Sequence, residues 1–197
     1  MRQSTSGLRP YIETNTFTFR YGNPNHGDRV IDSQFATSAK YRSTTMHGNE
    51  TMFGVNFADG RIKGYPVGRN SRMPGRGEKT YYALYVRGNR NYGQNSYLDN
   101  GDGTVNDVAT GLIWMKIDSG ALKSGKNGAM NWQQALTFAE NLDYAGYSDW
   151  RLPDAKELHS IVDYTRCPVV TDSAAIDPIF DVTSIPNEGN KKDYPYY

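Results

Sequence analysis

The stretch that decides the fold is residues 145–158, Ala-Gly-Tyr-Ser-Asp-Trp-Arg-Leu-Pro-Asp-Ala-Lys-Glu-Leu. We expect Gly146 to let the chain leave a helix, because glycine readily adopts the left-handed conformation found at helix ends. Trp150 and Leu152 alternate with a charged residue, as on a short half-buried strand, which Pro153 ends. No side chain here is arranged as a nucleophile, a general base or a metal cage. The stretch therefore indicates architecture rather than chemistry.

Two helices are expected around this stretch. Asp154 and Glu157 have the spacing of a capping box, so a helix is predicted over residues 154–163. An upstream helix over residues 131–143, capped by Asn131, follows from apolar residues with helical periodicity. The predicted core consists of Trp114, Trp132, Leu136, Ala139, Trp150, Leu152, Leu158, Ile161 and Val162.

Composition suits a globular chain with an aromatic core. The 197 residues are 37% hydrophobic and include Tyr 15, Phe 7 and Trp 3. The formal net charge is only +1, so bulk charge does not predict nucleic acid as a partner. The charge is unevenly distributed, because residues 61–90 hold eight Lys or Arg and one acidic residue, whereas residues 91–197 hold eight basic and fifteen acidic residues.

Several features are expected to be absent. No stretch approaches eighteen apolar residues, so no membrane-spanning segment is predicted. The start of the chain has no apolar core typical of a signal peptide. The single cysteine, Cys167, excludes an intrachain disulfide framework and a zinc cage built from cysteines.

The strands are expected mostly before the helices. Residues 53–57 and 61–65 alternate around Ala-Asp-Gly, which is a strong hairpin signal. Residues 81–86 are β-formers throughout, and residues 110–114 also read as a strand. Residues 1–50 read as irregular, with short strand-like pieces such as residues 16–21. The predicted fold is α+β, with two helices packed on a twisted antiparallel sheet and long loops.

Motifs with fixed spacing reveal a family resemblance. They are Asp-Asn-Gly-Asp-Gly-Thr-Val at 99–105, Thr-Gly-Leu at 110–112, and the positions Trp114, Trp132, Gly146, Asp149, Trp150, Arg151, Leu152, Pro153, Glu157 and Leu158. Together they resemble the Lcl C-terminal domain family, which is named for a Legionella collagen-like adhesin and was long a domain of unknown function. The resemblance implies a fold similar to that of C-type lectins.

The order of the motifs implies a fragment of a tandem two-domain protein. Residues 41–45, 55–61 and 85–88 resemble motifs from the second half of the family, yet they come first here. We therefore interpret residues 1–88 as the C-terminal half of a first domain, 89–98 as a linker and 99–197 as the N-terminal half of a second. Because domain termini lie close together, the two halves are expected to pack as a circular permutant. Two half-domains that pack poorly are the alternative.

The resemblance also raises an enzymatic interpretation, since the family is similar in fold to formylglycine-generating enzymes. That chemistry needs a pair of cysteines, and the single Cys167 disfavours it. Cys167 is then either a loop residue or, as the resemblance implies, half of a disulfide whose partner lies outside this chain. His26, His47 and His159 have no recognisable catalytic partners. We expect no catalytic residue and no cofactor.

A metal site is not expected either. Asp99, Asp102 and Asp107 resemble part of a calcium loop, but Thr110 stands where an EF-hand has its bidentate glutamate. A turn that starts a strand explains this run more simply. Calcium remains a minor alternative, because some C-type-lectin folds use it.

The best candidate for a binding surface is the basic, tyrosine-containing segment in the first half. It comprises Arg61, Lys63, Arg69, Arg72, Arg76 and Lys79, with Tyr65, Tyr81 and Tyr82 interleaved. Arginine binds sulfate and phosphate through a rigid fork of donors, and tyrosine can stack on sugar rings. The family's namesake is associated with sulfated polysaccharides, which such a surface suits. The alternative is a solvated loop that protects a hairpin edge from aggregation.

These observations favour a non-catalytic module that binds a polysaccharide or a surface protein in adhesion. A purely structural repeat of a large envelope protein is the second interpretation, and an enzyme is the third. The resemblance implies an extracellular or cell-envelope location. The sequence leaves the ligand and the oligomeric state open.

Overall fold

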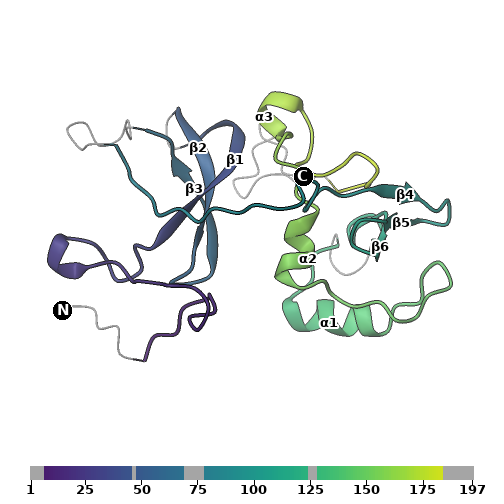
Figure 1. The fold of residues 1–197 in the computed structure, drawn as a ribbon. Helices are drawn as coiled ribbons and strands as arrows, with labels where there is room; N and C mark the ends of the chain where they lie inside the picture. The colour runs from purple at the N-terminus through teal and green to yellow at the C-terminus, as the bar shows by residue number, and fades with distance from the viewer. Residues whose placement is uncertain (1–6, 46–47, 69–77, 124–127, 184–197) are drawn as a thin grey trace. The chain divides into compact units, whose positions relative to one another are not determined.

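The computed structural model describes residues 7–45, 48–68, 78–123 and 128–183. The chain forms two compact units, Met1–Gly88 and Asn89–Tyr197. Each unit contains one three-stranded antiparallel sheet, and the α-helices lie in the second unit (Figure 1). The expected α+β class is confirmed, but the strands form two separate sheets rather than one.

The first unit contains the predicted hairpin. Its sheet has the order β1 (Gln34–Thr45), β2 (Asn49–Asn56) and β3 (Arg61–Pro66), after a 3₁₀ turn η1 (Pro24–His26). β2 and β3 pair in antiparallel register from Asn56–Arg61 to Thr51–Pro66. Gly60 in the connecting turn has φ +74°, which explains why glycine stands there.

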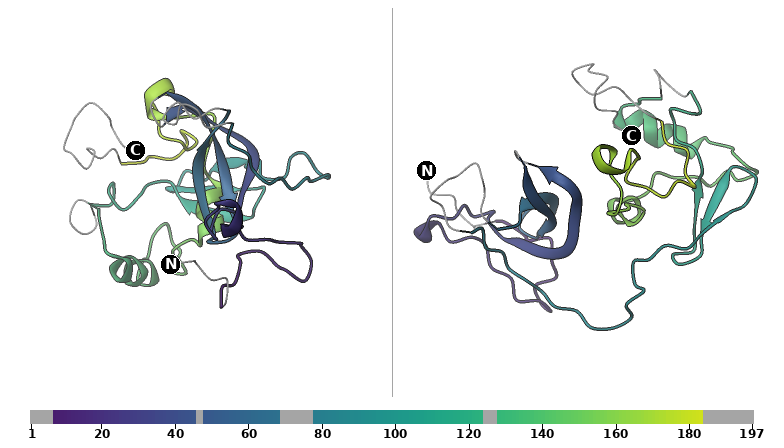
Figure 2. Two further views of the ribbon diagram at one scale, coloured as in Figure 1. Left: turned by 90° about the vertical axis from the view of Figure 1, so that its left-hand side faces the viewer. Right: turned by 90° about the horizontal axis from the view of Figure 1, so that it is seen from above.

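β1 corrects the expectation that residues 1–50 are irregular. The strand is twelve residues long and pairs with β2, with register shifts between Ala36 and Lys40 and between Lys40 and Thr44. Such irregularities bend a strand, and the curvature of β1 is visible in Figure 2. The strand-like piece at residues 16–21 is not a strand.

Residues 81–86 do not form the predicted strand. Tyr82 alone makes a bridge, parallel to Phe35, with backbone hydrogen bonds from Tyr82 N to Gln34 O and from Ala36 N to Tyr82 O, each 2.9 Å. Tyr85 and Val86 are almost fully exposed. Their β-forming side chains lack the neighbours that would make the conformation favourable.

The second unit contains β4 (Tyr97–Asp99), β5 (Thr104–Asp107) and β6 (Leu112–Met115) as a meander in that order. The predicted strand at 110–114 corresponds to β6. Asp107 at the end of β5 is fully buried, and its carboxylate accepts hydrogen bonds from Asn95 Nδ2, Ser96 N, Ala109 N and Thr110 Oγ1 at 2.8–3.2 Å. This carboxylate ties the segment before β4 to the turn between β5 and β6.

Both predicted helices are present, together with a short third one. They are α1 (Trp132–Glu140), α2 (Ala155–Ser160) and α3 (Pro168–Thr171). Asn131 caps α1 with Gln134 as its reciprocal partner, and the capping box of Asp154 and Glu157 starts α2. These start signals are local in sequence, which is why they could be recognised in advance.

The described part of the chain does not show the expected packing of the helices on a sheet. No helix Cα there lies within 8 Å of a strand Cα. Three predicted core residues are exposed as a result: Trp132 by 73%, Leu158 by 54% and Leu152 by 36%. Ala139 is buried as predicted, and the other buried apolar side chains of this unit include Val105, Cys167 and Phe180.

The glycine of the deciding stretch has a different role from the one expected. α1 ends well before it, and Ala145 and Gly146 instead form a two-residue turn with φ values of 54° and 79°. Tyr144 and Tyr147 close this turn through two backbone hydrogen bonds of 3.0 Å. Both central residues have positive φ, as in a type I′ hairpin turn.

Trp150 packs against this small hairpin. Its Nε1 donates to Tyr144 O at 3.2 Å, and its ring makes edge contacts with the rings of Tyr144 and Tyr147 at centroid distances of 6.2 and 6.0 Å. Trp150 is only half-buried, and residues 150–152 do not form the expected strand. The tryptophan is therefore held by a turn rather than by a sheet.

Candidate functional site

Strand β3 places three of the predicted binding residues on one face of the first sheet. Arg61, Lys63 and Tyr65 stand at alternate positions, and alternate side chains of a strand share a face. The ring of Tyr65 lies against Gly54 of β2, where an added Cβ would come within 2.6 Å of the ring. Gly54 thus allows the tyrosine to lie flat over the neighbouring strand.

Tyr81 and Lys79 join this face from beyond the sheet. The rings of Tyr65 and Tyr81 are 5.7 Å apart at an interplanar angle of 55°, and Lys79 Nζ lies 5.9 Å from the centre of the Tyr81 ring. Tyr81 Oη donates to Pro66 O at 2.8 Å, which fixes the ring beside the end of β3. We call Arg61, Lys63, Tyr65, Lys79 and Tyr81 the basic tyrosine surface.

Burial raises the pKa of both tyrosines of this surface above the ordinary value, at which a phenol is already neutral at physiological pH. Burial raises the pKa of Tyr81 to about 12 and also raises the pKa of Tyr65, where the Asp59 charge adds to the effect. Their hydroxyl groups are therefore hydrogen-bond donors at every physiological pH. Their rings remain neutral, as stacking on a sugar requires.

The positively charged side chains of the surface differ in whether they form an ion pair with a carboxylate. Arg61 Nε forms an ion pair with Asp59 at 2.8 Å. Lys63 and Lys79 are exposed, and neither forms an ion pair with another described residue. The two ammonium groups are thus the charges of this surface that an anion can use.

A second ion pair supports the same region. Arg29 and Asp32 are joined at 2.7 Å, and hydrogen bonds from the Arg29 side chain lower the pKa of Asp32 to about 2. The charges of both residues act on Tyr65. Sequence reasoning did not identify this pair, and its short spacing within a turn was the available signal.

The structure divides the rest of the predicted surface. Tyr82 follows Tyr81 directly and contacts the ring of Phe35 at 5.5 Å. Phe35 pairs with Val55 and Val55 with Ile62, so these residues share the face opposite to Lys63 and Tyr65. Tyr82 therefore does not belong to the basic tyrosine surface. Arg69, Arg72 and Arg76 lie outside the described residues.

The other candidate groups have structural partners. His159 Nε2 is 2.7 Å from Tyr164 Oη. Cys167 is fully buried and forms no disulfide. The backbone N of Cys167 donates a hydrogen bond to Thr171 Oγ1 at 2.8 Å. Asp99 forms an ion pair with Lys116 at 2.7 Å, and Asp102 accepts from Thr104 N and Oγ1. Asp99 thus connects its turn to the end of β6, whereas Asp102 stabilises its own turn.

Residues 103–196 match the Lcl C-terminal domain. This match confirms the expected family for residues 103–196 of the second unit. The matched residues include β5, β6, the helices and the Tyr144–Trp150 hairpin. The Lcl match suggests an adhesin-related domain for residues 103–196. Comparisons with curated proteins and with solved structures gave no match.

The Lcl match and the basic tyrosine surface occupy different parts of the chain. The matched residues begin at 103, whereas the surface is formed by residues 61–81. Within the described residues, no helix is long and apolar enough to cross a membrane. Any role of the surface must therefore be argued from its own chemistry.

Proposed function

We propose that this protein is a non-catalytic surface or envelope module that binds acidic glycans, including sulfated ones, through the basic tyrosine surface. One observation carries the proposal: two neutral tyrosine rings lie side by side, flanked by two ammonium groups without an ion-pair partner among the described residues. An acidic sugar offers both an apolar ring face and negative charges to such a surface.

The chemistry of an acidic polysaccharide fits each part of this surface. The apolar face of a sugar ring can pack on the rings of Tyr65 and Tyr81, while sulfate or carboxylate groups pair with Lys63 and Lys79. Residues 1–88 contain 13 Lys or Arg and six Asp or Glu, so the unit as a whole attracts polyanions. Such attraction raises the rate of encounter and is screened by salt.

The family relation supports the setting rather than the ligand. An adhesin-related domain in the second unit supports the proposal that this protein meets other surfaces. The C-type-lectin-like architecture stays a prediction for both units, and an experimental structure would test it.

A structural repeat is the second candidate function. The Lcl signature favours it, because Arg151 and Glu157 bind each other and Trp150 packs on its own hairpin. These residues maintain a scaffold without presenting free groups to a ligand. A glycan array distinguishes the two functions, since a structural repeat should retain no glycan.

Chromatography on immobilised heparin tests the proposed surface directly. The wild-type chain should be retained at physiological ionic strength, about 0.15 M salt. The double variant Lys63→Ala/Lys79→Ala should elute at clearly lower salt. The control Arg9→Ala/Arg42→Ala removes the same charge from exposed positions of the same unit and should elute near the wild type.

Two results would contradict the proposal. One is a wild-type chain that is not retained at that salt concentration. The other is equal elution of the lysine variant and its control, since retention would then reflect net charge alone. The triple variant Arg69→Ala/Arg72→Ala/Arg76→Ala shows whether the predicted arginines contribute to the same binding.

A further inference from the structure

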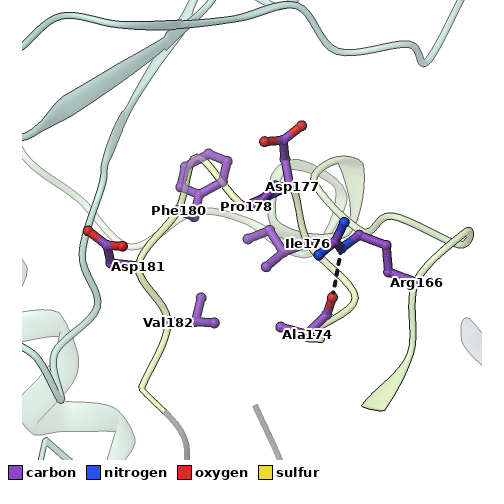
Figure 3. Close-up of a pocket in the computed structure, with 8 residues that line it drawn as sticks. All are labelled: Arg166, Ala174, Ile176, Asp177, Pro178, Phe180, Asp181 and Val182. Atoms are coloured by element: carbon purple, nitrogen blue, oxygen red, sulfur yellow. Dashed lines mark hydrogen bonds between the residues drawn. The ribbon is translucent and has the colours of Figure 1, made fainter. Parts of the chain in front are cut away.

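The second unit contains a cavity with a volume of about 300 Å³. Residues 166–182 form it, and it lies in a part of the chain separate from the basic tyrosine surface. Figure 3 shows the side chains of Ile176, Phe180 and Val182 around its centre, with the guanidinium of Arg166 at one side. Its lining thus combines apolar side chains with one cationic group and with the carboxylates of Asp177 and Asp181.

The position of the Arg166 guanidinium is fixed by its own chain. Its Nε donates to Ala174 O at 3.4 Å, so the side chain extends along the cavity wall (Figure 3). The two terminal nitrogens form no hydrogen bond with another described residue. A guanidinium presented in this way has the fork geometry that binds a carboxylate through two parallel hydrogen bonds.

The acidic side chains at the rim are engaged elsewhere. Asp177 Oδ1 accepts a hydrogen bond from Ile179 N at 2.8 Å, and Asp181 interacts electrostatically with Lys116. Figure 3 shows both carboxylates directed away from Ile176 and Val182. Arg166 is therefore the positively charged group of the pocket, and the two carboxylates lie at its rim.

The apolar wall is also held in place. Phe180 is buried, and its ring packs edge-on against Tyr97 at 5.2 Å. Its backbone N bonds to Asp177 O, and the N of the next residue, Asp181, bonds to Lys116 O at 2.8 Å beside the end of β6. A wall held on both sides of Phe180 lowers the entropic cost of binding.

We propose that this cavity binds a small monocarboxylate with an apolar body. The carboxylate would pair with the terminal nitrogens of Arg166, and the hydrocarbon body would lie against Ile176, Phe180 and Val182. An apolar floor with a few polar groups that fix orientation is the usual composition of a small-molecule site. The size of the cavity limits the ligand to a body of a few carbons.

The test is a titration of the full chain with hexanoate as the probe. Binding is monitored by NMR. Hexanoate should bind saturably, in the millimolar range expected for so small a ligand. Hexanamide has the same shape without the charge and should bind about fivefold more weakly or worse. Acetate, which lacks the apolar body, should not saturate.

Two variants assign the binding to the cavity. Arg166→Gln should remove the preference for hexanoate over hexanamide, and Ala174→Leu should weaken both probes by filling the cavity. Arg90→Gln removes an exposed arginine of the same unit and should behave as the wild type. Equal binding of hexanoate and hexanamide to the wild type, or no saturable binding of hexanoate, would overturn the proposal without depending on how any variant folds.

Discussion

Arg151 and Glu157 are joined by two parallel hydrogen bonds, of 2.7 Å from Nη1 to Oε2 and of 2.6 Å from Nη2 to Oε1. The same carboxylate accepts from Asp154 N at 2.8 Å, which completes the capping box of α2. One glutamate thus fixes both the segment before Pro153 and the start of the helix after it. This arrangement explains why the two charged residues of the motif are six positions apart.

Replacing Glu157 by Gln should destabilise the second unit in a pH-dependent way. Hydrogen bonds from Arg151 lower the pKa of Glu157 from 4.5 to about 2. A lowered pKa means stability that is present above the unfolded pKa and is lost as pH falls through the folded pKa. We expect Glu157→Gln to lower Tm by a few degrees at pH 7, and the difference from the wild type to shrink between pH 4.5 and 2.

Thermal melts followed by circular dichroism at several pH values check this. Asp143→Asn, at an exposed position, is the control and should show no such dependence. A Tm difference that stays constant down to pH 2 would show that the charge of Glu157 does not matter.

Asp107 should be among the most sensitive polar positions of the chain. Burial raises its pKa, but the hydrogen bonds from Ser96, Thr110 and Asn95 outweigh that effect, and the net pKa is lowered. Asp107→Asn turns an amide N–H₂ toward groups that themselves donate, and it should cost about 2–3 kcal/mol of unfolding free energy. Urea denaturation measures the cost. The exposed Asp149→Asn should change stability by less than about 0.5 kcal/mol.

Two tryptophans of the family motif should respond differently to truncation. Trp150 has a hydrogen-bonded indole and two aromatic contacts, so Trp150→Ala should cost about 2–4 kcal/mol. Trp132 is 73% exposed at the start of α1, so Trp132→Ala should stay within about 0.5 kcal/mol. Chemical denaturation of both variants tests the comparison. A large loss for Trp132→Ala would mean that its indole is covered in the folded protein.

Alanine substitutions at two glycines with similar φ angles distinguish the cost of backbone strain from the cost of a steric clash. Gly103 has φ +94° and Gly111 has φ +75°, so an alanine at either position is strained. At Gly103 the added Cβ would also collide with the Tyr144 hydroxyl, whereas Gly111 has open space. Gly111→Ala should cost about 1 kcal/mol and Gly103→Ala clearly more. Equal losses in urea denaturation would show that Tyr144 moves aside freely.

The relation between the two halves of the chain gives a further prediction from the sequence. If residues 1–88 and 99–197 behave as one circularly permuted domain, cleavage of the full chain within the linker 89–98 should leave the pieces associated in gel filtration. Their opposite charge balance favours this outcome, since residues 89–197 hold nine basic and fifteen acidic residues. Pieces that separate would show that the halves are independent.

Local signals explain which parts of the fold could be predicted. The β2–β3 hairpin and the caps at Asn131 and Asp154 depend on residues a few positions apart, and they were recognised correctly. β1 is rich in Ser, Thr and Ala without clear alternation, and its pairing with β2 decides its conformation. Residue propensities alone do not predict a strand whose conformation depends on pairing with a neighbouring strand.

The candidate site shows the same limit. Sequence spacing identified Lys63, Tyr65 and Tyr81, but the prediction wrongly grouped Tyr82 with them, although successive residues of a strand point to opposite faces. The bridge to Phe35 shows which face Tyr82 occupies. The exposure of Trp132 and Leu158 was missed for a related reason. Helical periodicity shows which residues share a stripe, whereas the partner of that stripe depends on the rest of the fold.

The hydrogen-bonding partners of Asp107 have a consequence for the order of folding. All of them lie between positions 95 and 110, so only short loops must close before the carboxylate is satisfied. Short loops close at little entropic cost and therefore quickly. The β4–β6 meander should consequently become protected from hydrogen exchange early in refolding.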